Sequence, residues 1–471
     1  MVSTEASSGT QLEDYQVPRE LLSKYAKPGP RYTSYPTAPE WADDFTQADA
    51  EALYRANNPE GSTAPLALYV HIPFCTSLCW YCGCNVQISR KKQVSEPYLK
   101  ALEQELDKIA PLIAKTRTIS QMHWGGGTPT YLEPEQIERL VAMIRQRIDF
   151  APGAEISIEV DPRVTTDEHV LALRRAGFNR LSMGIQDFNP QVQQAVHRVQ
   201  SFEQTQHLVN FAREQGFASI NMDLMYGLPH QTVASFEQTL EQVFSLSPDR
   251  LALFHYAHVP WLKPAQKLLK EETLPDSDTK LAIFELAIAS FLERGYVYIG
   301  MDHFAKPEDE LALAQKEHSL RRNFMGYTTQ AGVDLYGLGV SSISEIDGHF
   351  IQNLREVPAY EGALAEGHLP THRGLLLSAD DHLRKAIIEN LICNGYLDFT
   401  QISRQFQVDF PQLFHSELEN CKEMAEDGLI ELTDGHIAVL PRGQILIRNV
   451  CMVWDAYLGK RSGQQMFSRT A

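Results

Sequence analysis

Short apolar runs alternate with longer segments of helical periodicity from about Leu66 to Gly300. The apolar runs read LALYVHI, SQMHWGG, EISIEVD, RLSMGIQ, SINMDLMYG and RLALFHYAH. Runs of this length and composition are typical of strands buried on both faces of a parallel sheet. The repeated strand-and-helix units therefore predict an α/β core, either doubly wound or curled into a full or partial barrel, with its chemistry at the carboxyl ends of the strands.

The segment SEPYLKALEQELDKIAPLI shows the clearest helical periodicity. Its apolar residues recur at spacings of three and four, at Leu99, Leu102, Leu106, Ile109 and Ile113. This spacing predicts an amphipathic helix that begins near Ser95 and extends through Ile113.

Two segments lie outside this core pattern. PGPRYTSYPTAPEW, from Pro28 to Trp41, is rich in proline and tyrosine and is predicted to run extended over the core surface. From about Ser378, helical patterns lead to EDGLIELTDGHIAVLPRG, in which the pair Asp434-Gly435 between apolar runs predicts a tight hairpin. Helices followed by such a hairpin indicate a small, winged-helix-like C-terminal domain.

The formal charge of -18 argues against nucleic acid as a partner, because nucleic-acid binding depends on Lys and Arg that neutralise phosphates. The C-terminal segment from Asp380 to Gly443 carries twelve acidic residues against five Lys and Arg, which is unsuited to a phosphate-binding face. The N-terminus shows no export signal, and nowhere do about 18 consecutive apolar residues occur. We expect a cytoplasmic protein with no membrane span.

Four of the seven cysteines lie in the stretch HIPFCTSLCWYCGC. Cytosolic thiols stay reduced, so this cluster indicates metal binding or catalysis rather than a disulfide framework. The spacing is C-x3-C-x2-C-x-C, whereas a structural zinc site usually needs a second ligand pair a dozen or more residues away. Three such cysteines can instead bind three irons of a 4Fe-4S cluster and leave the fourth iron open, so the cluster is favoured and zinc is the alternative. The other three cysteines are interpreted as buried core thiols: Cys393, Cys421 and Cys451.

Polar or glycine-rich residues follow several predicted strands. The second predicted strand ends in HWGGGTPT, whose three glycines indicate either a bend or backbone left bare for a close ligand, which we favour. Glu159 in IEVDPR, Gln186 in MGIQDF and Asp223 in NMDLMYGLP also lie at strand ends. Each could be structural alone, but several at one rim of a sheet indicate a site.

A C-x3-C-x2-C loop after a first strand resembles the signature of the radical S-adenosylmethionine (SAM) superfamily. The resemblance implies a partial (β/α)6 TIM-like barrel, in which the open iron of a 4Fe-4S cluster holds SAM. An electron from the reduced cluster then cleaves SAM to methionine and a 5'-deoxyadenosyl radical. The glycine-rich segment is implied to receive the amino group of SAM.

Further motifs extend the resemblance over nearly the whole chain, from about Lys24 to Arg469. They are GPRYTSYPTA, YVHIPFCTSLCWYCGCN, HWGGGTPTYL, IEVDPR, RLSMGIQDFN, NMDLMYGLP, FHYAHVP, GMDHFAKPEDELALA and QQMFSR. In this order they resemble the oxygen-independent coproporphyrinogen III oxidase (dehydrogenase) family. We expect an N-terminal extension wrapping the core at residues 1–60, a catalytic barrel with a substrate-pocket extension at 61–370, and the C-terminal domain at 371–471.

The family resemblance implies specific site residues and two bound SAM molecules. The implied cluster ligands are Cys75, Cys79 and Cys82, whereas Cys84 is not a ligand. The positions implied for the cluster-bound SAM are Tyr69, Gly126, Glu159 and Ile343. The positions implied for the second SAM are Tyr81, Gly127, Thr128, Gln186, Arg198, Asp223 and Ala257. Tyr81 stands where some family members carry phenylalanine, and its aromatic ring is expected to keep the contact.

The implied reaction converts two propionates of coproporphyrinogen III to vinyl groups and gives protoporphyrinogen IX in haem biosynthesis. It needs an electron donor such as a flavodoxin or ferredoxin, and a monomer is expected. Four substrate carboxylates call for local basic residues, with solvated surface charge as the alternative interpretation; the candidates are Arg31, Lys306, Arg321 and Arg322. The segment from Pro28 to Trp41 is hypothesised to close over the substrate.

Two other radical SAM functions are alternatives. The haem chaperones, which bind haem without decarboxylating its precursor, resemble the core but usually lack GPRYTSYPTA and QQMFSR. An RNA-modifying enzyme is disfavoured by the acidic C-terminal segment.

Overall fold

The computed structural model describes residues 12–458, which form two compact units. One unit comprises Trp41–Ala287 and Gly332–Leu376. The other comprises the described parts of Met1–Glu40, Ile288–Ala331 and Leu377–Ala471. The three domain ranges expected from the sequence remain a prediction, since these units divide the chain at other points. We call the two units the barrel unit and the C-terminal unit.

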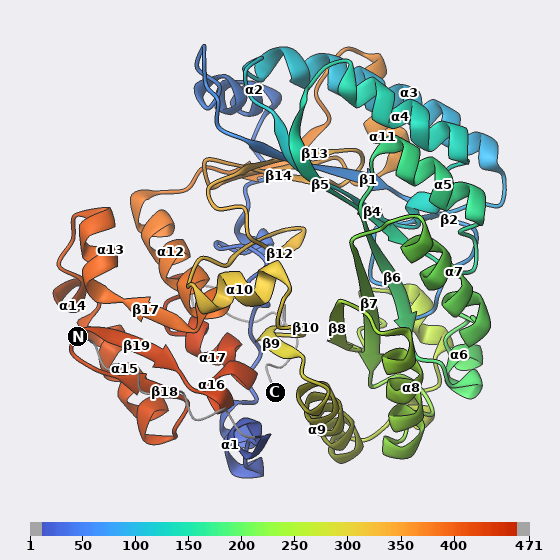
Figure 1. The fold of residues 1–471 in the computed structure, drawn as a ribbon. Helices are drawn as coiled ribbons and strands as arrows, with labels where there is room; N and C mark the ends of the chain where they lie inside the picture. Colours follow the sequence, from blue (N-terminus) through green and yellow to red (C-terminus); the bar gives the residue numbers. More distant parts are fainter. Residues whose placement is uncertain (1–11, 459–471) are drawn as a thin grey trace. The chain divides into compact units, whose positions relative to one another are not determined.

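The barrel unit is built on a curved sheet with helices on its outer face (Figure 1). Its strands follow the order β16-β15-β14-β13-β1-β4-β5-β6-β7-β8. Neighbours from β1 to β8 pair in parallel, and so do β1 and β13, whereas β13 to β16 pair antiparallel. The parallel series β1, β4, β5, β6, β7, β8 confirms the predicted partial (β/α)6 barrel of the radical SAM type.

The strands of this sheet are β1 (Leu66–Ile72), β4 (Ile119–Gly126), β5 (Phe150–Val160), β6 (Arg180–Gln186), β7 (Ser219–Tyr226), β8 (Arg250–His255), β13 (Asp334–Leu338), β14 (Ile343–Ile346), β15 (His349–Asn353) and β16 (Thr371–Leu375). The helices of the barrel unit are α2 (Gln47–Ala56), α3 (Ser95–Ile109), α4 (Pro134–Arg145), α5 (Asp167–Ala176), α6 (Pro190–Ala195), α7 (Phe202–Glu214), α8 (Val233–Leu246) and α11 (Val357–Ala365). Helix α9 (Ser277–Glu293) spans the boundary between the units in the sequence.

Helix α3 begins at Ser95, as predicted, but ends earlier than the periodicity suggests. After Ile109 the chain continues as a 3-10 turn, Ala110–Leu112, and Ile113 is already extended. Pro111 has no backbone N–H to donate into an α-helical ladder, which accounts for the change of helix type. The predicted helical position of Ile113 is therefore wrong, although its side chain is buried as its apolar character requires.

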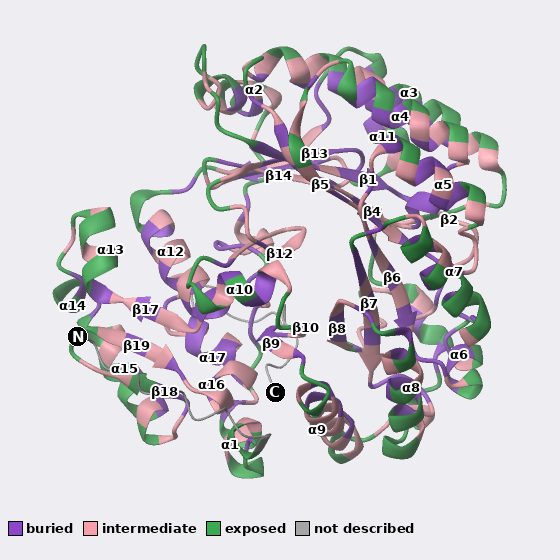
Figure 2. Ribbon diagram, viewed as in Figure 1, coloured by how far each residue is buried: buried purple, intermediate pink, exposed green. Residues whose placement is uncertain are grey.

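The parallel strands are not buried on both faces as the sequence predicts. Along β6 buried residues alternate with part-buried ones, and the part-buried positions end at Gln186 (Figure 2). On β5 the Glu159 side chain is 44% accessible, although its neighbours Ile158 and Val160 are buried. Helices cover one face of the curved sheet, so the part-buried face is the one left for polar side chains.

The buried Glu105 carboxyl connects α3 to residues that follow β13 in the chain. Glu105 is fully buried and accepts hydrogen bonds from the Tyr360 hydroxyl at 2.5 Å, the Gly339 N–H at 2.7 Å and the Asn353 amide at 2.5 Å. Burial raises the pKa of Glu105 to about 7, even though all three donors act in the opposite direction.

We expect Glu105→Gln to flatten the pH dependence of stability. Between the unfolded pKa of about 4.5 and the folded pKa of about 7, the folded state keeps a proton that the unfolded state has lost. The wild-type free energy of unfolding therefore falls by about 3 kcal/mol as pH rises through this window. Urea unfolding at pH 5 and pH 8 measures the difference. Glu103→Gln, in the same helix with its side chain 42% accessible, is the control; equal pH dependence in both variants would contradict the prediction.

The C-terminal unit combines short sheets with helices. Its strands are β9 (Val297–Gly300), β10 (His303–Ala305), β11 (Arg321–Asn323), β12 (Gly326–Thr328), β17 (Tyr396–Asp398), β18 (Ile430–Leu432) and β19 (His436–Val439). Its helices are α1 (Arg19–Tyr25), α10 (Glu310–Lys316), α12 (Ala379–Asn394), α13 (Phe399–Phe406), α14 (Phe410–Leu413), α15 (His415–Glu426), α16 (Pro441–Ile445) and α17 (Ile447–Met452). The antiparallel pair β18 and β19 confirms the hairpin at Asp434-Gly435, and β17 joins it to give helices beside a small sheet.

The tyrosine-rich segment from Pro28 to Trp41 is not an extended surface strap. Tyr32 and Tyr35 lie in the hydrophobic core of the C-terminal unit, and the segment contains bends and a 3-10 turn, Ala38–Glu40. The Tyr32 hydroxyl donates to Asp455 at 3.0 Å, and the Tyr35 hydroxyl accepts from the Ala456 N–H at 3.1 Å. Large aromatic side chains stabilise most when they are buried, so the prediction of a surface course is wrong.

Other sequence expectations have mixed outcomes. The cysteines Cys393, Cys421 and Cys451 are buried, as predicted. The QQMFSR motif lies outside the described residues. Over residues 12–458, no helix combines the length and the apolar character that crossing a membrane would require.

Candidate active site

The cysteine-rich loop follows the carboxyl end of β1, as predicted. After Ile72 the chain forms the short strand β2 (Phe74–Cys75), which pairs in parallel with β3 (Gln87–Ile88). The Gln87 N–H donates to the Pro73 carbonyl at 2.7 Å. This pairing closes the loop at its base and fixes its cysteines beside the ends of the barrel strands.

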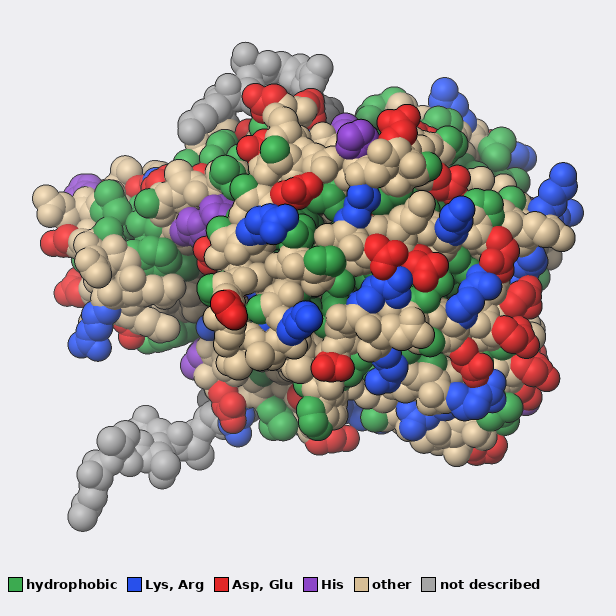
Figure 3. All heavy atoms as spheres, turned by 90° about the horizontal axis from the view of Figure 1, so that it is seen from above, with side chains coloured by type: hydrophobic (Ala, Val, Ile, Leu, Met, Phe, Trp, Pro, Cys, Tyr) green, Lys and Arg blue, Asp and Glu red, His purple; other side chains and the backbone are tan. Residues whose placement is uncertain are grey.

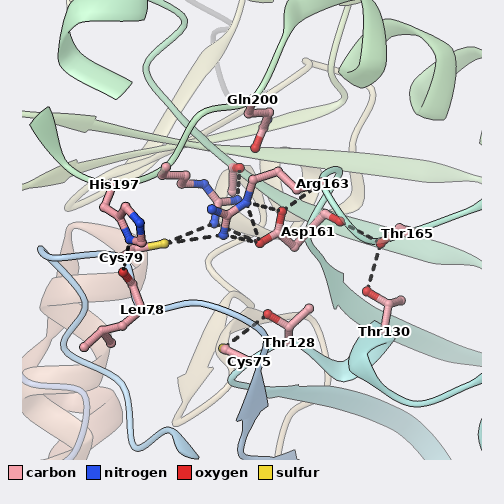
Figure 4. A network of polar contacts seen from close by, with 12 residues as sticks. Cys75, Leu78, Cys79, Thr128, Thr130, Asp161, Arg163, Thr165, His197 and Gln200 are labelled. Carbon is pink, nitrogen blue, oxygen red and sulfur yellow. Dashed lines mark hydrogen bonds and ion pairs between the residues drawn. The ribbon is translucent and has the colours of Figure 1, made fainter. Parts of the chain in front are cut away.

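Two of the predicted cluster ligands, Cys75 and Cys79, have different polar neighbours (Figure 4). Cys75 Sγ lies 3.3 Å from the Thr128 hydroxyl. Cys79 Sγ accepts from Arg163 Nη2 at 3.5 Å and from Arg198 Nη1 at 3.7 Å.

The Cys82 and Cys84 thiols shift each other's pKa. The contact with Cys84 lowers the pKa of Cys82 to about 6 and raises that of Cys84. Burial instead raises the pKa of Cys75 to about 11. Cys82 therefore reaches its thiolate form more easily than Cys75, and Cys84 is the more exposed member of the pair.

The three thiols of the loop offer the donor set of a four-iron cluster. Among residues 12–458, no three His, Cys, Asp or Glu side chains converge closely enough to hold one metal ion. A four-iron cluster offers iron atoms at separate corners, so three thiolates spread over one loop match its donor set. Cys79 and Cys82 also lie near enough to Cys75 for their charges to raise its pKa.

Asp161 organises the arginines beside Cys79. Its carboxylate accepts from Arg163 Nη2 at 2.6 Å and from Arg198 Nη1 at 3.1 Å. Burial would raise the pKa of Asp161, but the two guanidinium groups hold it at about 2, so the carboxylate is ionised. Sequence reasoning chose Glu159 from IEVDPR and missed Asp161 and Arg163. The motif does contain a signal for them: Asp161 comes two residues before Arg163, and buried charges need partners of opposite sign.

The glycines Gly125–Gly127 let protein groups approach the backbone closely. A Cβ at the first would lie 2.9 Å from the Glu159 carboxylate, at the second 2.6 Å from the His71 ring, and at the third 2.8 Å from the Phe74 carbonyl oxygen. The N–H of the second glycine donates to Glu159 at 3.2 Å. Close approach by the protein itself thus explains all three glycines, and a bound ligand stays a proposal.

Tyr69 and Glu159 are brought together by two histidines. Glu159 lies 3.6 Å from His123 Nε2, and the His123 ring stacks on Tyr69 with centroids 6.1 Å apart. His71 Nε2 donates to the Asn85 carbonyl at 3.0 Å, so its Nδ1 accepts from the Tyr69 hydroxyl at 3.1 Å. This tautomer is neutral, in agreement with burial lowering the pKa of His71.

Ile343 adjoins the same group of residues. Ile343 is the first residue of β14, and its backbone lies close to Gly337. If Gly337 carried a Cβ, that atom would lie only 2.6 Å from the Ile343 carbonyl oxygen. Gly337 is in turn the partner of Tyr69 in the register of β1 and β13. All four positions expected for one SAM molecule, namely Tyr69, Gly126, Glu159 and Ile343, therefore lie around the end of β1.

The positions expected for a second SAM molecule are spread over strands and loops of the barrel unit. Gln186 ends β6, as predicted, whereas Asp223 lies inside β7 rather than at its end, where the sequence placed it. Gln186 adopts a left-handed φ of 65°, and its buried Oε1 has no hydrogen-bond partner. Arg198 Nη2 donates to the Gly184 carbonyl at 2.6 Å, while its buried Nε has no partner. Burial raises the pKa of Asp223 to about 7. Buried polar atoms without partners are rare in proteins, so these atoms are candidate ligand contacts.

Gln266 joins two of these positions and was not found by sequence reasoning. Its Nε2 lies 3.3 Å from both the Tyr81 and the Ala257 carbonyl oxygens, and its Oε1 accepts from the Val259 N–H at 2.6 Å. The side chain is 2% exposed. No sequence signal marks it, because a glutamine that bonds only to backbone can do so from any loop of suitable length.

Replacing Gln266 by alanine is expected to lower the free energy of unfolding by about 1–3 kcal/mol, because the Val259 N–H loses its partner. Affinity for SAM should fall as well, since Tyr81 and Ala257 are no longer tied together. Thermal unfolding and calorimetric titration with SAM measure the two effects. Gln191→Ala, at an exposed position of α6, serves as the control, and equal behaviour of the two variants would refute the bridging role.

The basic residues considered for substrate carboxylates belong to the C-terminal unit. Arg31 forms an ion pair with Asp302. Arg322 donates to the backbone carbonyls of Arg31 and Tyr32, at 3.3 and 3.0 Å. Arg321 donates to the Leu320 carbonyl at 3.0 Å. These three side chains are thus engaged within their own unit rather than free in solvent, and their role toward a substrate stays a prediction, as does that of Lys306.

The family comparisons agree with this geometry. Residues 69–243 match the model of the Radical SAM superfamily, and residues 377–446 match that of the HemN C-terminal domain. The chain is 49% identical to the oxygen-independent coproporphyrinogen III oxidase of Salmonella typhimurium over 95% of its own length and 97% of that protein. The Escherichia coli protein of the same name gives 49% identity with the same coverage.

A solved structure, described as coproporphyrinogen III oxidase (HemN) from Escherichia coli and as a radical SAM enzyme, superposes with a TM-score of 0.89. That match covers 93% of this chain and 99% of the other, at 48% identity. The barrel, the cysteine loop and the superfamily match define a radical SAM enzyme, a class whose members use a 4Fe-4S cluster and SAM. At this identity and coverage, the chain belongs to the oxygen-independent coproporphyrinogen III oxidase family.

Proposed function

We propose that this protein catalyses the oxygen-independent oxidative decarboxylation of two propionate side chains of coproporphyrinogen III to vinyl groups, giving protoporphyrinogen IX for haem biosynthesis. One observation carries the proposal: a loop bearing Cys75, Cys79 and Cys82 follows the first barrel strand in a chain 49% identical to two oxidases of this name. The relatives reported above support this reading, and none of them is named a haem chaperone.

The proposed reaction requires a radical. A propionate β-carbon has no acidic proton for a base, so hydrogen must be removed as an atom; CO2 then leaves, and the remaining electron passes to an external electron acceptor. When bound, the cluster and SAM supply a 5'-deoxyadenosyl radical for this hydrogen abstraction. The protein's own groups hold the cofactor and keep water away from it, and the buried or part-buried positions around β1 suit that task.

Two SAM molecules are proposed, one at each group of residues. Tyr69, Gly126, Glu159 and Ile343 would hold the cluster-bound molecule. Tyr81, Gly127, Thr128, Gln186, Arg198, Asp223 and Ala257 would hold the second. Support for the second site comes from the unpartnered Gln186 Oε1 and Arg198 Nε, which a polar ligand would satisfy.

The proposed partners follow from the reaction. A one-electron donor protein such as a flavodoxin or ferredoxin would reduce the cluster, and the enzyme would act as a cytoplasmic monomer. Nucleic acid is not a proposed partner: on the face drawn in Figure 3, Lys and Arg side chains are interspersed with Asp and Glu.

Closure of the segment from Pro28 to Trp41 over the substrate also remains a hypothesis. Deleting it would remove core tyrosines, so its test should use substitutions at exposed positions such as Thr33.

The experiment is a turnover assay without oxygen. The cluster is reconstituted and reduced, SAM and coproporphyrinogen III are added, and 5'-deoxyadenosine and protoporphyrin are quantified together. Formation of both products is expected. If 5'-deoxyadenosine formed without decarboxylation, the proposed substrate would be wrong. If neither product formed and the protein bound haem tightly, a haem chaperone would be indicated.

A further inference from the structure

Two arginines lie beside the Cys79 sulfur. Arg163 and Arg198 both donate to its sulfur, and Asp161 lies between them (Figure 4). Two guanidinium groups and one carboxylate leave a net charge of +1. The side chains of these three residues are only 19%, 9% and 8% accessible, so solvent screens their charges weakly.

Arg163 is held rigidly in this position. Its Nε lies 3.0 and 3.1 Å from the two Asp161 oxygens, and its Nη2 lies 2.6 Å from Oδ2. Thr165 fastens the same turn, with its hydroxyl donating to the Asp161 carbonyl at 2.8 Å. A two-point contact of this kind fixes the direction of the guanidinium plane, and with it the N–H aimed at Cys79.

Arg198 cannot replace Arg163 in this role, because its other nitrogen is occupied by the Gly184 carbonyl at 2.6 Å. Asp161 contacts both guanidinium groups, Arg163 at 2.6 Å and Arg198 at 3.1 Å, so it neutralises one of the two positive charges and one remains beside Cys79. Of the two arginines, Arg163 has the N–H closer to the sulfur, at 3.5 Å against 3.7 Å.

We infer that Arg163, positioned by Asp161, raises the reduction potential of the cluster bound through Cys79. Reduction adds one electron to the cluster and no proton, so the net negative charge on the cluster and its thiolates increases by one. A nearby positive charge and N–H donors to a ligand sulfur stabilise that state. The inference rests on the proposed function only for the presence of the cluster, and Arg163 is a positioning residue rather than a catalytic one.

The test is an anaerobic redox titration of the reconstituted full chain without SAM, with dithionite as reductant and the reduced cluster followed by electron paramagnetic resonance. Arg163→Met should lower the potential, so that the reduced-to-oxidised ratio at a fixed solution potential falls about tenfold, which is 59 mV for one electron. Asp161→Asn should raise the ratio by a similar factor. The double variant, with Arg198 as the one remaining charge, should return close to the wild type.

The opposite signs separate a charge effect from structural damage. Damage would move both single variants in the same direction, and the double variant would be worse than either; those results would overturn the inference. Arg180→Met is the matched control, since Arg180 pairs with Glu155 at similar burial and lies at the other end of β6. Its potential should equal that of the wild type.

The inference can still be tested if the Arg163→Met variant fails to bind the cluster. If Arg163→Met retains no iron, Arg163→Lys and Asp161→Asn decide: the lysine variant keeps the charge but loses the two-point contact, so its ratio should fall by less than tenfold, and that of the asparagine variant should rise. Any other pair of results contradicts the inference. A cluster with the expected shifts but no protoporphyrin would refute the proposed function alone, whereas product formation with unchanged potentials would refute the inference alone.

Discussion

Replacing Cys79 by alanine is expected to abolish cluster binding and, with it, formation of 5'-deoxyadenosine. The substitution removes one of three thiolate ligands and leaves the two arginine N–H groups without their sulfur acceptor. Activity should fall by more than about 100-fold, beyond the usual effect of changing a residue that only contacts a ligand. Iron and sulfide analysis, the brown absorption of the protein and the yield of 5'-deoxyadenosine measure the effect.

Cys84→Ala provides the control from the same loop. Cys84 is exposed, whereas Cys79 is buried. This variant should bind iron like the wild type, because the three proposed ligand thiols, Cys75, Cys79 and Cys82, are all retained. If Cys84→Ala lost iron as completely as Cys79→Ala, the set of three ligands would be wrong.

Gly126→Ala is expected to lower the free energy of unfolding by about 3–4 kcal/mol, through two separate causes. The residue has a φ of 113°, a conformation that side chains rarely adopt, and the new Cβ would lie 2.6 Å from the His71 ring. The His71 ring must then move, which disturbs its contacts with Tyr69 and Asn85. Urea unfolding measures the loss of stability, and calorimetric titration should show weaker SAM binding.

Gly153→Ala separates the two causes. Gly153 also lies in a barrel strand with a positive φ, 74°, but a Cβ added there would have no atom within 4 Å. Only the conformational cost, about 1–2 kcal/mol, should remain, and SAM binding should be unchanged. Equal losses in the two variants would mean that contact with His71 contributes nothing.

The barrel and the place of the cysteine loop could be predicted from the sequence, because both depend on local pattern. Apolar runs that alternate with helical segments specify parallel strands, and HIPFC follows the first run directly. The course of the tyrosine-rich segment could not be predicted. Proline and tyrosine describe a local conformation, whereas burial of Tyr32 depends on residues near Asp455, far away in the chain.

The candidate site was predictable where one residue type has a single chemical use. Cysteines at this spacing and glycines after a strand have few explanations, whereas Asp161 and Arg163 are ordinary charged residues until their distances to Cys79 are known. Gln266 is a clearer case still. Its partners are backbone atoms of Tyr81 and Ala257, and backbone atoms leave no trace in a sequence.

The composition of the C-terminal unit has a consequence for how the chain is made. Tyr32 and its partner Asp455 are 423 positions apart, so the ribosome completes nearly the whole chain before that contact can form. The barrel unit ends at Leu376 and can assemble earlier, because domains fold as units as synthesis proceeds. Tyr32 is therefore synthesised early, but its side chain can pack against its partner only when synthesis is nearly complete. A chain that stops before Asp455 would retain the barrel strands and lack the hydrogen-bond acceptor of Tyr32.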